Sequence, residues 1–230
     1  MQSNSTGIDL ILDHVPDVSF ILTTARGVYD EEVATHAVAM ALALVRGLHR
    51  FRDAQREHRW ARQPLRLMSD LSALVLGWGG IGQSIARMLR PFGTEVRAGT
   101  RDAWRERLDV DLLFLALPLT RETRHIVGAN ELSALKPGAF VINAGRGATL
   151  DTEALLSSSH LGGAALDVFE DEPLPHAHPL WAREDVIITP HVAHSPETAP
   201  FRWEALFEEN LRRFAAGEPL MHAVDPERGY

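Results

Sequence analysis

Short apolar runs and helical stretches alternate along most of this chain. Between residues 71 and 189, runs of continuous apolar character recur, as expected for strands with both faces covered. The stretches between them have helical periodicity and end at turn residues such as Pro91 and Gly93. Strands joined by helices in this way predict a doubly wound, parallel α/β sheet. We expect strands at 71–76, 94–98, 112–117, 139–143, 163–168 and 186–189, and helices at 82–89, 131–135 and 152–157.

The two ends of the chain carry different patterns. Residues 18–23 form an apolar run that predicts a short buried strand. Apolar residues three and four positions apart, from Val33 to Leu48, predict a helix that begins near Asp30. A further helix is expected at 197–216, followed by a polar tail.

Composition narrows the class of protein. Of the 230 residues, 45% are hydrophobic, which is enough for a sizeable core. The formal net charge of −8 argues against a nucleic-acid partner. Arginines gather between Arg46 and Arg66, but Asp53 and Glu57 lie among them. We therefore interpret this stretch as a solvated helix face.

Two absences bear on localisation. The chain has no cysteine, which excludes disulfides, thiolate metal sites and a thiol nucleophile, and which fits a reducing compartment. Residues 1–6 have no signal-peptide pattern, and the longest apolar stretches are too short or too interrupted to span a bilayer. We therefore expect a cytoplasmic protein without a membrane partner.

A glycine-rich turn follows the first strand of the regular region. The pattern G-x-G-x-x-G occupies residues 77–82, between an apolar strand and the start of a helix. The first glycine permits a tight turn, the second lets the backbone approach a diphosphate, and the third allows close packing of helix on strand. In this setting we favour dinucleotide binding on a Rossmann sheet over an incidental glycine turn. The assigned cofactor-binding residues are Gly77, Gly79, Gly80, Ile81 and Gly82.

The end of the second strand bears on the choice of cofactor. NAD-binding sheets usually carry an Asp or Glu there for the ribose 2′-hydroxyl. Here Thr100 and Arg101 occupy that end. A hydroxyl and a guanidinium suit a 2′-phosphate, so we expect NADP, with NAD as the alternative cofactor. The structural alternative is that Arg101 is a surface residue beside a turn.

Three later segments place charged residues at strand ends. They are NAGRG at 143–147, LDVFEDEP at 166–173 and TPHVA at 189–193. Together with the glycine loop, they make the chain resemble the D-isomer-specific 2-hydroxyacid dehydrogenases. The likeness extends from about residue 7 to residue 216 and includes LPLT at 117–120 and HPLW at 178–181. It implies hydride transfer between a nicotinamide cofactor and a small 2-keto or 2-hydroxy acid.

The resemblance implies that Arg146, Glu172 and His191 form the catalytic set. Arg146 would hold the substrate carboxylate and help to polarise the keto oxygen. Protonated His191 would give its proton to that oxygen as the hydride is delivered. Glu172 would hydrogen-bond the far side of the imidazole and keep a proton available on it.

The resemblance also implies a set of binding residues. Asp167 would accept a hydrogen bond from the nicotinamide carboxamide. The backbone N–H groups of Thr6, Gly7 and Ile8 would join Arg146 in binding the substrate carboxylate. The remaining cofactor contacts are assigned to Leu117, Pro118, Thr123, Ala144 and Ala193.

Each catalytic assignment has a structural alternative. Arg146 could instead cap a turn, and His191 could be a structural histidine after a proline. Glu172 lies in an acidic run with Glu170 and Asp171, any of which could be merely solvated. A Glu at this position, where the related formate dehydrogenases carry Gln, points to hydroxy-acid chemistry.

The spacing of two histidines also raises the question of a metal site. His176 and His178 have the spacing of a metal-binding pair, but no third ligand is evident. We interpret both as loop residues and expect no metal.

The chain departs from the family in its substrate-binding domain. Relatives begin with a flavodoxin-like substrate domain, most of which precedes the cofactor domain, and Met1 falls inside that domain. We therefore expect a truncated chain in which 1–48 is a remnant of that domain with the linking helix, 49–195 is the Rossmann domain, and 196–230 is a helix that returns to the substrate domain. Thr35 and His194 stand where the family commonly has Glu and Gly.

These expectations lead to two functions of different classes. The first is an NADP-preferring reductase of a small 2-keto acid, with glyoxylate or hydroxypyruvate as candidate substrates. The alternative is a catalytically impaired dinucleotide-binding protein, a dimeric sensor similar to corepressors of this family. The intact catalytic set favours the enzyme, and the truncated substrate domain favours the binder, while a remnant with neither activity is a third interpretation. The resemblance implies a homodimer.

Overall fold

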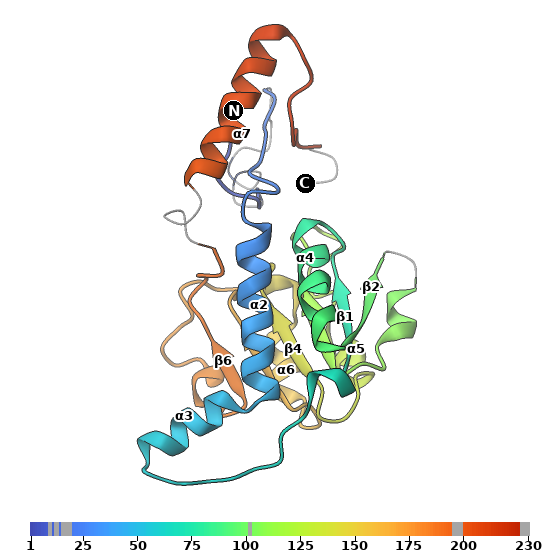
Figure 1. The fold of residues 1–230 in the computed structure, drawn as a ribbon, viewed down its shortest axis with the longest axis vertical. Helices are drawn as coiled ribbons and strands as arrows, with labels where there is room; N and C mark the ends of the chain where they lie inside the picture. Colours follow the sequence, from blue (N-terminus) through green and yellow to red (C-terminus); the bar gives the residue numbers. More distant parts are fainter. Residues whose placement is uncertain (9–10, 12–13, 15–19, 101–102, 195–199, 226–230) are drawn as a thin grey trace.

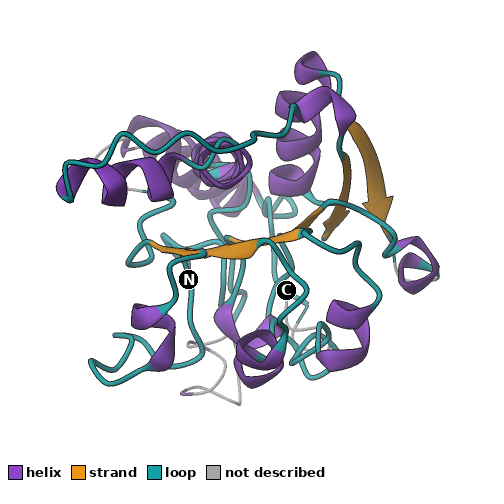
Figure 2. Ribbon diagram, turned by 90° about the horizontal axis from the view of Figure 1, so that it is seen from below, coloured by secondary structure: helices purple, strands orange, loops and turns teal. Residues whose placement is uncertain are grey.

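A six-stranded parallel sheet with helices on both faces forms the larger part of the molecule (Figures 1 and 2). The computed structural model describes residues 1–225 except 9–10, 12–13, 15–19, 101–102 and 195–199. The strands are β1 (Ser72–Leu76), β2 (Glu95–Gly99), β3 (Leu112–Leu115), β4 (Phe140–Asn143), β5 (Gly163–Leu166) and β6 (Val186–Ile188). Each lies within two residues of its predicted bounds.

The order of the strands places a crevice in the middle of the sheet. The order is β2-β1-β3-β4-β5-β6, and all neighbouring strands are parallel. After β1 the chain moves to one side to form β2 and then crosses to the other side to form β3. In such sheets ligands bind beyond the carboxyl ends of the strands, at this switch point. The predicted α/β doubly wound fold is confirmed.

Two apolar cores sandwich the sheet because successive strand side chains point to opposite faces. In β1, Ala73 and Val75 pack into the core covered by α2 and α4, whereas Leu74 and Leu76 pack into the core covered by α5 and α6. The whole of β1 is buried, which explains its continuous apolar character. The helices are α2 (Asp30–Val45), α3 (Leu48–Arg56), α4 (Gly80–Leu89), α5 (Ala129–Ser133), α6 (Thr152–Ser157) and α7 (Pro200–Ala216), with 3-10 turns η1 (Met68–Asp70), η2 (Arg90–Phe92), η3 (Trp104–Arg107), η4 (Gly147–Thr149) and η5 (Pro179–Ala182).

Helix α2 links the sheet to a smaller part of the molecule. That part contains the first residues of the chain, α7 and the described residues that follow α7, and α2 runs from it down along the sheet (Figure 1). Along its length α2 packs against α4, β4 and β5. Three acidic residues in its first turn, Asp30, Glu31 and Glu32, suit the positive end of the helix dipole. Gly47, in the left-handed conformation, separates α2 from α3.

Among the described residues of the smaller part, isolated bridges and hydrogen bonds take the place of a sheet. Thr23 forms single β-bridges to Gln2 and to Ala223. The side chain of Asn210 on α7 donates to Gln2 Oε1 over 2.8 Å and accepts from Met221 N over 2.8 Å. These hydrogen bonds join the two terminal segments to α7.

The predicted strand at 18–23 is wrong for its described residues, 20–23. Only Thr23 takes part in a bridge, and the side chains of Phe20 and Ile21 are 41% and 56% exposed. Backbone hydrogen bonds join the run to both terminal segments, such as Thr23 N to Met1 O and Val224 N to Leu22 O, but they do not form a continuous ladder of bridges. An apolar run forms a buried strand only where neighbouring strands cover it.

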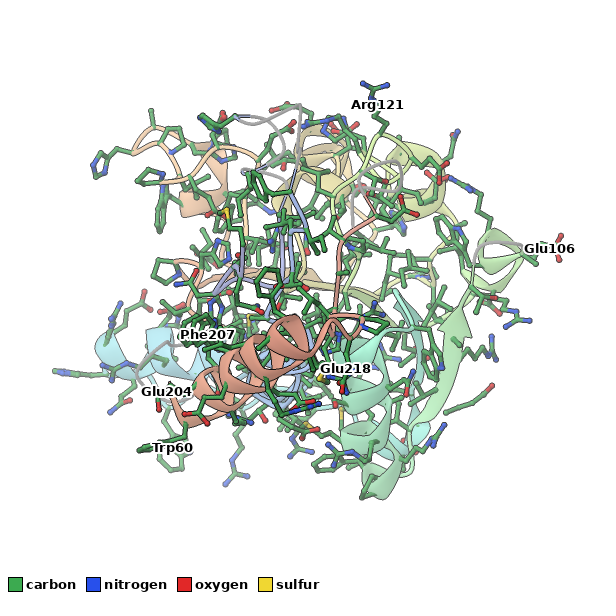
Figure 3. The ribbon with its side chains drawn as sticks, turned by 90° about the horizontal axis from the view of Figure 1, so that it is seen from above. Trp60, Glu106, Arg121, Glu204, Phe207 and Glu218 are labelled. Atoms are coloured by element: carbon green, nitrogen blue, oxygen red, sulfur yellow. The ribbon has the colours of Figure 1, made fainter. Side chains whose placement is uncertain are left out.

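Other apolar side chains project into solvent beyond the sheet. Trp60, on the extended segment after α3, is 90% exposed and stands at the margin of the molecule in Figure 3. Among the described residues, no helix combines the length and apolar character that a bilayer span requires.

Candidate active site

The glycine loop has free space beside its backbone at one glycine, whereas neighbouring backbone atoms fill that space at two others. Gly77 has φ +93°, and a Cβ there would clash with the backbone of Ala116. A Cβ at Gly82 would clash with the carbonyl of Gly77, so both positions are closed by backbone packing. At Gly79, by contrast, a Cβ would meet no atom within 4 Å. The N-terminus of α4, which begins at Gly80, is therefore accessible to a diphosphate through Gly79.

Gly80 has a different neighbour. A Cβ at this position would clash with the carboxylate of Asp30, at the start of α2. Burial raises the pKa of Asp30 above its ordinary value, while a backbone hydrogen bond from Gly27 and the charge of Arg26 lower it. The side chain at the beginning of α2 thus packs directly against the loop that begins α4.

A large cavity lies over the carboxyl ends of the strands. Its volume is about 1370 Å³, more than the ~300–1,000 Å³ of typical small-molecule pockets, so it has room for a dinucleotide and a small substrate together. Of the predicted site residues, those that line it are Thr6, Gly7, Gly77, Gly79, Gly80, Ile81, Thr100, Leu117, Pro118, Thr123, Ala144, Arg146, Asp167, Glu172, His191 and Ala193.

Three predicted site residues are not among those that line the cavity. Gly82 serves the packing of α4 on β1. The side chain of Ile8 is buried, at 2% exposure. Arg101 lies outside the described residues, so its predicted contact with a 2′-phosphate stays a prediction.

The turn after β4 carries Arg146. The side chain of Asn143 accepts from Gly145 N over 3.1 Å and donates to Arg146 O over 3.0 Å. Thr149 Oγ1 also donates to Arg146 O, over 2.6 Å, and Arg146 Nη1 donates to Gly145 O over 2.9 Å. These hydrogen bonds fix the backbone of the turn and place a half-buried guanidinium on the cavity wall.

His191 and Glu172 form a close pair on the same cavity. His191 Nδ1 lies 2.7 Å from Glu172 Oε2, and Glu172 Oε1 accepts from Phe169 N over 2.9 Å. Because Nδ1 is engaged, Nε2 is the ring nitrogen left for proton exchange with a substrate. Glu170, the neighbour in the acidic run, instead pairs with Arg124 and His125. The geometry therefore distinguishes Glu172 from Glu170.

Asp167, at the end of β5, is fully buried and accepts several hydrogen bonds. Its donors are Thr189 Oγ1 at 2.5 Å, Val192 N at 3.0 Å and Ala193 N at 2.9 Å. Burial alone would raise its pKa, but these donors and His36 outweigh burial and hold the pKa at about 2. The carboxylate thus organises the loop that carries His191. Its predicted contact with the nicotinamide carboxamide stays a prediction.

A second imidazole lies beside the pair of His191 and Glu172. The ring of His194 is 4.7 Å from that of Tyr29 and 6.4 Å from that of His191, measured between centroids. Burial lowers the pKa of His194, and the charges of His191 and Arg146 lower it further. His194 thus shares its surroundings with both predicted catalytic cations.

Sequence reasoning missed the part of the site that α2 supplies. Tyr29 and Asp30 line the cavity, and His36 reaches Thr189, yet none of them was assigned a role. The available signal was weak: His36 stands in an Ala-Thr-His stretch that resembles a family motif.

Known proteins match the chain over most of its length. Residues 38–193 match the family described as D-isomer specific 2-hydroxyacid dehydrogenase, NAD binding domain. The glyoxylate reductase of Aeropyrum pernix is 33% identical over 233 residues, which cover 90% of this chain and 70% of that enzyme.

Solved structures match the fold equally well. A D-isomer specific 2-hydroxyacid dehydrogenase from Xanthobacter autotrophicus, in complex with NADPH and MES, has a TM-score of 0.89 and 33% identity. An NADPH-dependent glyoxylate/hydroxypyruvate reductase from Sinorhizobium meliloti, in complex with NADP and sulfate, has a TM-score of 0.90 and 28% identity. Each match covers 100% of this chain and 79% of the other. The chain therefore belongs to the D-isomer specific 2-hydroxyacid dehydrogenase family.

Proposed function

We propose that this chain is an oxidoreductase that uses NADPH to reduce a small 2-keto acid, with glyoxylate or hydroxypyruvate as substrate. The observation that carries the proposal is the 2.7 Å contact between His191 Nδ1 and Glu172 Oε2. It lies on the wall of the cavity that Arg146 and the glycine loop also line. The imidazole of His191, paired with the carboxylate of Glu172, can donate a proton, and Arg146 can bind the anionic substrate beside it. This combination suits carbonyl reduction.

The residues present fit a dinucleotide. Gly79 is open to the close approach of a diphosphate, and the N-terminus of α4 supplies backbone N–H groups for it. When bound, the nicotinamide would supply the hydride from its C4 atom. Leu117 and Ala193 would contact the cofactor from the cavity wall.

The substrate steps belong to three side chains. Arg146 binds the carboxylate of the keto acid as a bidentate pair and stabilises charge on the keto oxygen. His191 would give the proton on Nε2 to that oxygen as carbon 2 takes up the hydride that a bound nicotinamide would supply, so the C=O bond would become CH–OH. Glu172 then stabilises the imidazole and orients it through Nδ1.

The preference for NADPH has two supports. Thr100, at the end of β2, lines the cavity where a ribose 2′-substituent would lie, and no Asp or Glu occupies that position. The relatives from Xanthobacter autotrophicus and Sinorhizobium meliloti are in complex with NADPH and NADP.

The proposal extends to a homodimer in a reducing, cytoplasmic compartment. The absence of cysteine fits such a compartment. The exposed side chains of Trp60 and Leu67, on the segment between α3 and β1, are apolar surface of the kind that oligomers bury.

The test is NADPH consumption by the purified chain in the presence of glyoxylate or hydroxypyruvate. We expect turnover by the wild type and a loss of about 10²–10⁴-fold in kcat for His191→Ala, the range of general acid catalysis. His178→Ala is the matched control, because that histidine caps η5 and should leave turnover unchanged. A folded wild type that binds NADPH but turns over neither substrate contradicts the proposal.

A further inference from the structure

A histidine on α2 contacts the loop that carries His191. His36 Nε2 lies 3.0 Å from Thr189 Oγ1, from a position 153 residues away in the sequence. The same nitrogen is 3.4 Å from Asp167 Oδ1. His36 is half-buried, and neither the family resemblance nor the proposed reaction gives it a role.

The protons in this cluster can be placed by counting donors. The pKa of Asp167 is about 2, so at neutral pH its carboxylate can only accept. Thr189 Oγ1 lies 2.5 Å from Asp167 Oδ1 and must donate its one proton there. The hydroxyl oxygen is then an acceptor toward His36. His36 Nε2 therefore carries a hydrogen, and the hydrogen bonds run from His36 to Thr189 to Asp167.

Asp167 also fixes the backbone of the loop that carries His191. Its carboxylate accepts from Val192 N and Ala193 N, and its own carbonyl accepts from His191 N over 2.8 Å. His191 has φ +52°, a left-handed conformation that costs free energy for most residues other than glycine. Asp167 thus holds three consecutive N–H groups and with them the strained backbone of His191.

We propose that His36 is a positioning residue for His191, acting through Thr189 and Asp167. This inference rests on the proposed function, because the effect is on a proton donor. By donating to Thr189, His36 selects the orientation in which the hydroxyl points at Asp167. That orientation fixes the carboxylate that organises residues 191–193. Helix α2, which also leads to the smaller part of the molecule, is thereby joined to the site of proton transfer.

The test compares two amide substitutions that place their N–H donor at different distances from Cβ. His36→Gln keeps an N–H donor three bonds from Cβ, as in histidine Nε2, whereas His36→Asn places it one bond short. We expect His36→Asn and His36→Ala to lower kcat about tenfold or more, since small misplacements of reacting groups have large effects on rate. His36→Gln should recover most of that loss. The KM for NADPH should change less than kcat in all three, because the glycine loop that would hold the diphosphate is not part of the cluster.

Two further variants separate positioning from general destabilisation. Thr189→Val removes the middle of the chain of hydrogen bonds, and the double variant with His36→Ala should lose no more kcat than either single one. Thr35→Ala, on the same helix, is the matched control. Its exposed hydroxyl bonds to Glu31 O and lies near Met88, so kcat should not change. Equal kcat for His36→Asn and His36→Gln, or losses that multiply in the double variant, would overturn the proposal.

A readout independent of turnover keeps this inference distinct from the proposed function. Proton–nitrogen correlation spectra of the histidine side chains in the full chain should show His36 with its hydrogen on Nε2, both in the wild type and in His191→Ala. Hydrogen on Nδ1 alone would contradict the donor assignment even in an active enzyme. If the wild type shows no turnover although His36 carries its hydrogen on Nε2, the proposed function is contradicted and the hydrogen-bond assignment stands.

Discussion

The two edges of the sheet each carry a buried aspartate, and the two are used differently. At the amino ends of the strands, Asp111 accepts from Ser72 N and Lys136 Nζ, each over 2.9 Å, and pairs with Arg66. At the carboxyl ends, Asp167 accepts from Thr189 and from the backbone of the His191 loop, and His36 Nε2 lies 3.4 Å from its Oδ1. Burial raises the pKa of each aspartate, and in both cases the hydrogen bonds outweigh burial and lower it.

The difference between the edges lies in where the hydrogen bonds lead. The partners of Asp111 are charged side chains and the backbone of β1. This cluster therefore joins β1 to the segment before β3 and includes no residue of the predicted site. The partners of Asp167 include the loop whose side chain, His191, is exposed to the cavity. A buried carboxylate therefore stabilises the fold at one edge and positions a reacting group at the other. This accords with the rule that sites lie at the carboxyl ends of parallel strands.

The largest effect we expect at the amino edge is on stability. Asp111→Ala leaves Lys136 and Arg66 without their shared carboxylate and Ser72 N without its acceptor. Breaking a buried ion pair typically destabilises by about 3–5 kcal/mol, and the partial exposure of both cations reduces this to about 2–3 kcal/mol. Urea unfolding measures the loss, and kcat at low temperature should stay within twofold of wild type. A large fall in kcat of folded protein would break the comparison between the edges.

A smaller effect, on binding alone, is expected in the glycine loop at the carboxyl edge. Gly79→Ala adds a Cβ into open space in front of the loop, where the diphosphate would lie. We expect the Kd for NADPH to rise about tenfold, or about 1.4 kcal/mol, with the urea midpoint unchanged. Gly82→Ala is the contrasting variant, because its Cβ would clash with the carbonyl of Gly77 and should lower stability. Equal effects of the two substitutions on stability would contradict the geometry of the loop.

The fold was predictable because both faces of the sheet are covered. Strands such as β1 and β3 are buried along their whole length, so their runs are continuously apolar, and their short length between turn residues marks them as strands. Residues 20–23 show the limit of this argument. Their run is equally apolar, but in the described structure it forms scattered backbone hydrogen bonds and isolated bridges to the terminal segments instead of a strand.

The candidate site was predictable only where motifs lie within one segment. Arg146, Glu172 and His191 were found from short motifs at strand ends, and the structure places all three on one cavity. His36 and Asp30 were not found, because each acts on a residue far away in the sequence: His36 on Thr189, and Asp30 on Gly80. Only the packing of α2 on the sheet brings these pairs together.

Hydride transfer itself can be tested most directly with an isotope. NADPH that carries deuterium at both C4 positions is incubated with glyoxylate and the purified chain, and the product is analysed by mass spectrometry. We predict glycolate with one deuterium on carbon 2 from the wild type, and far slower formation of the same product by His191→Ala. Glycolate without deuterium, or no product from folded protein that binds NADPH, would contradict the assignment of this cavity to carbonyl reduction.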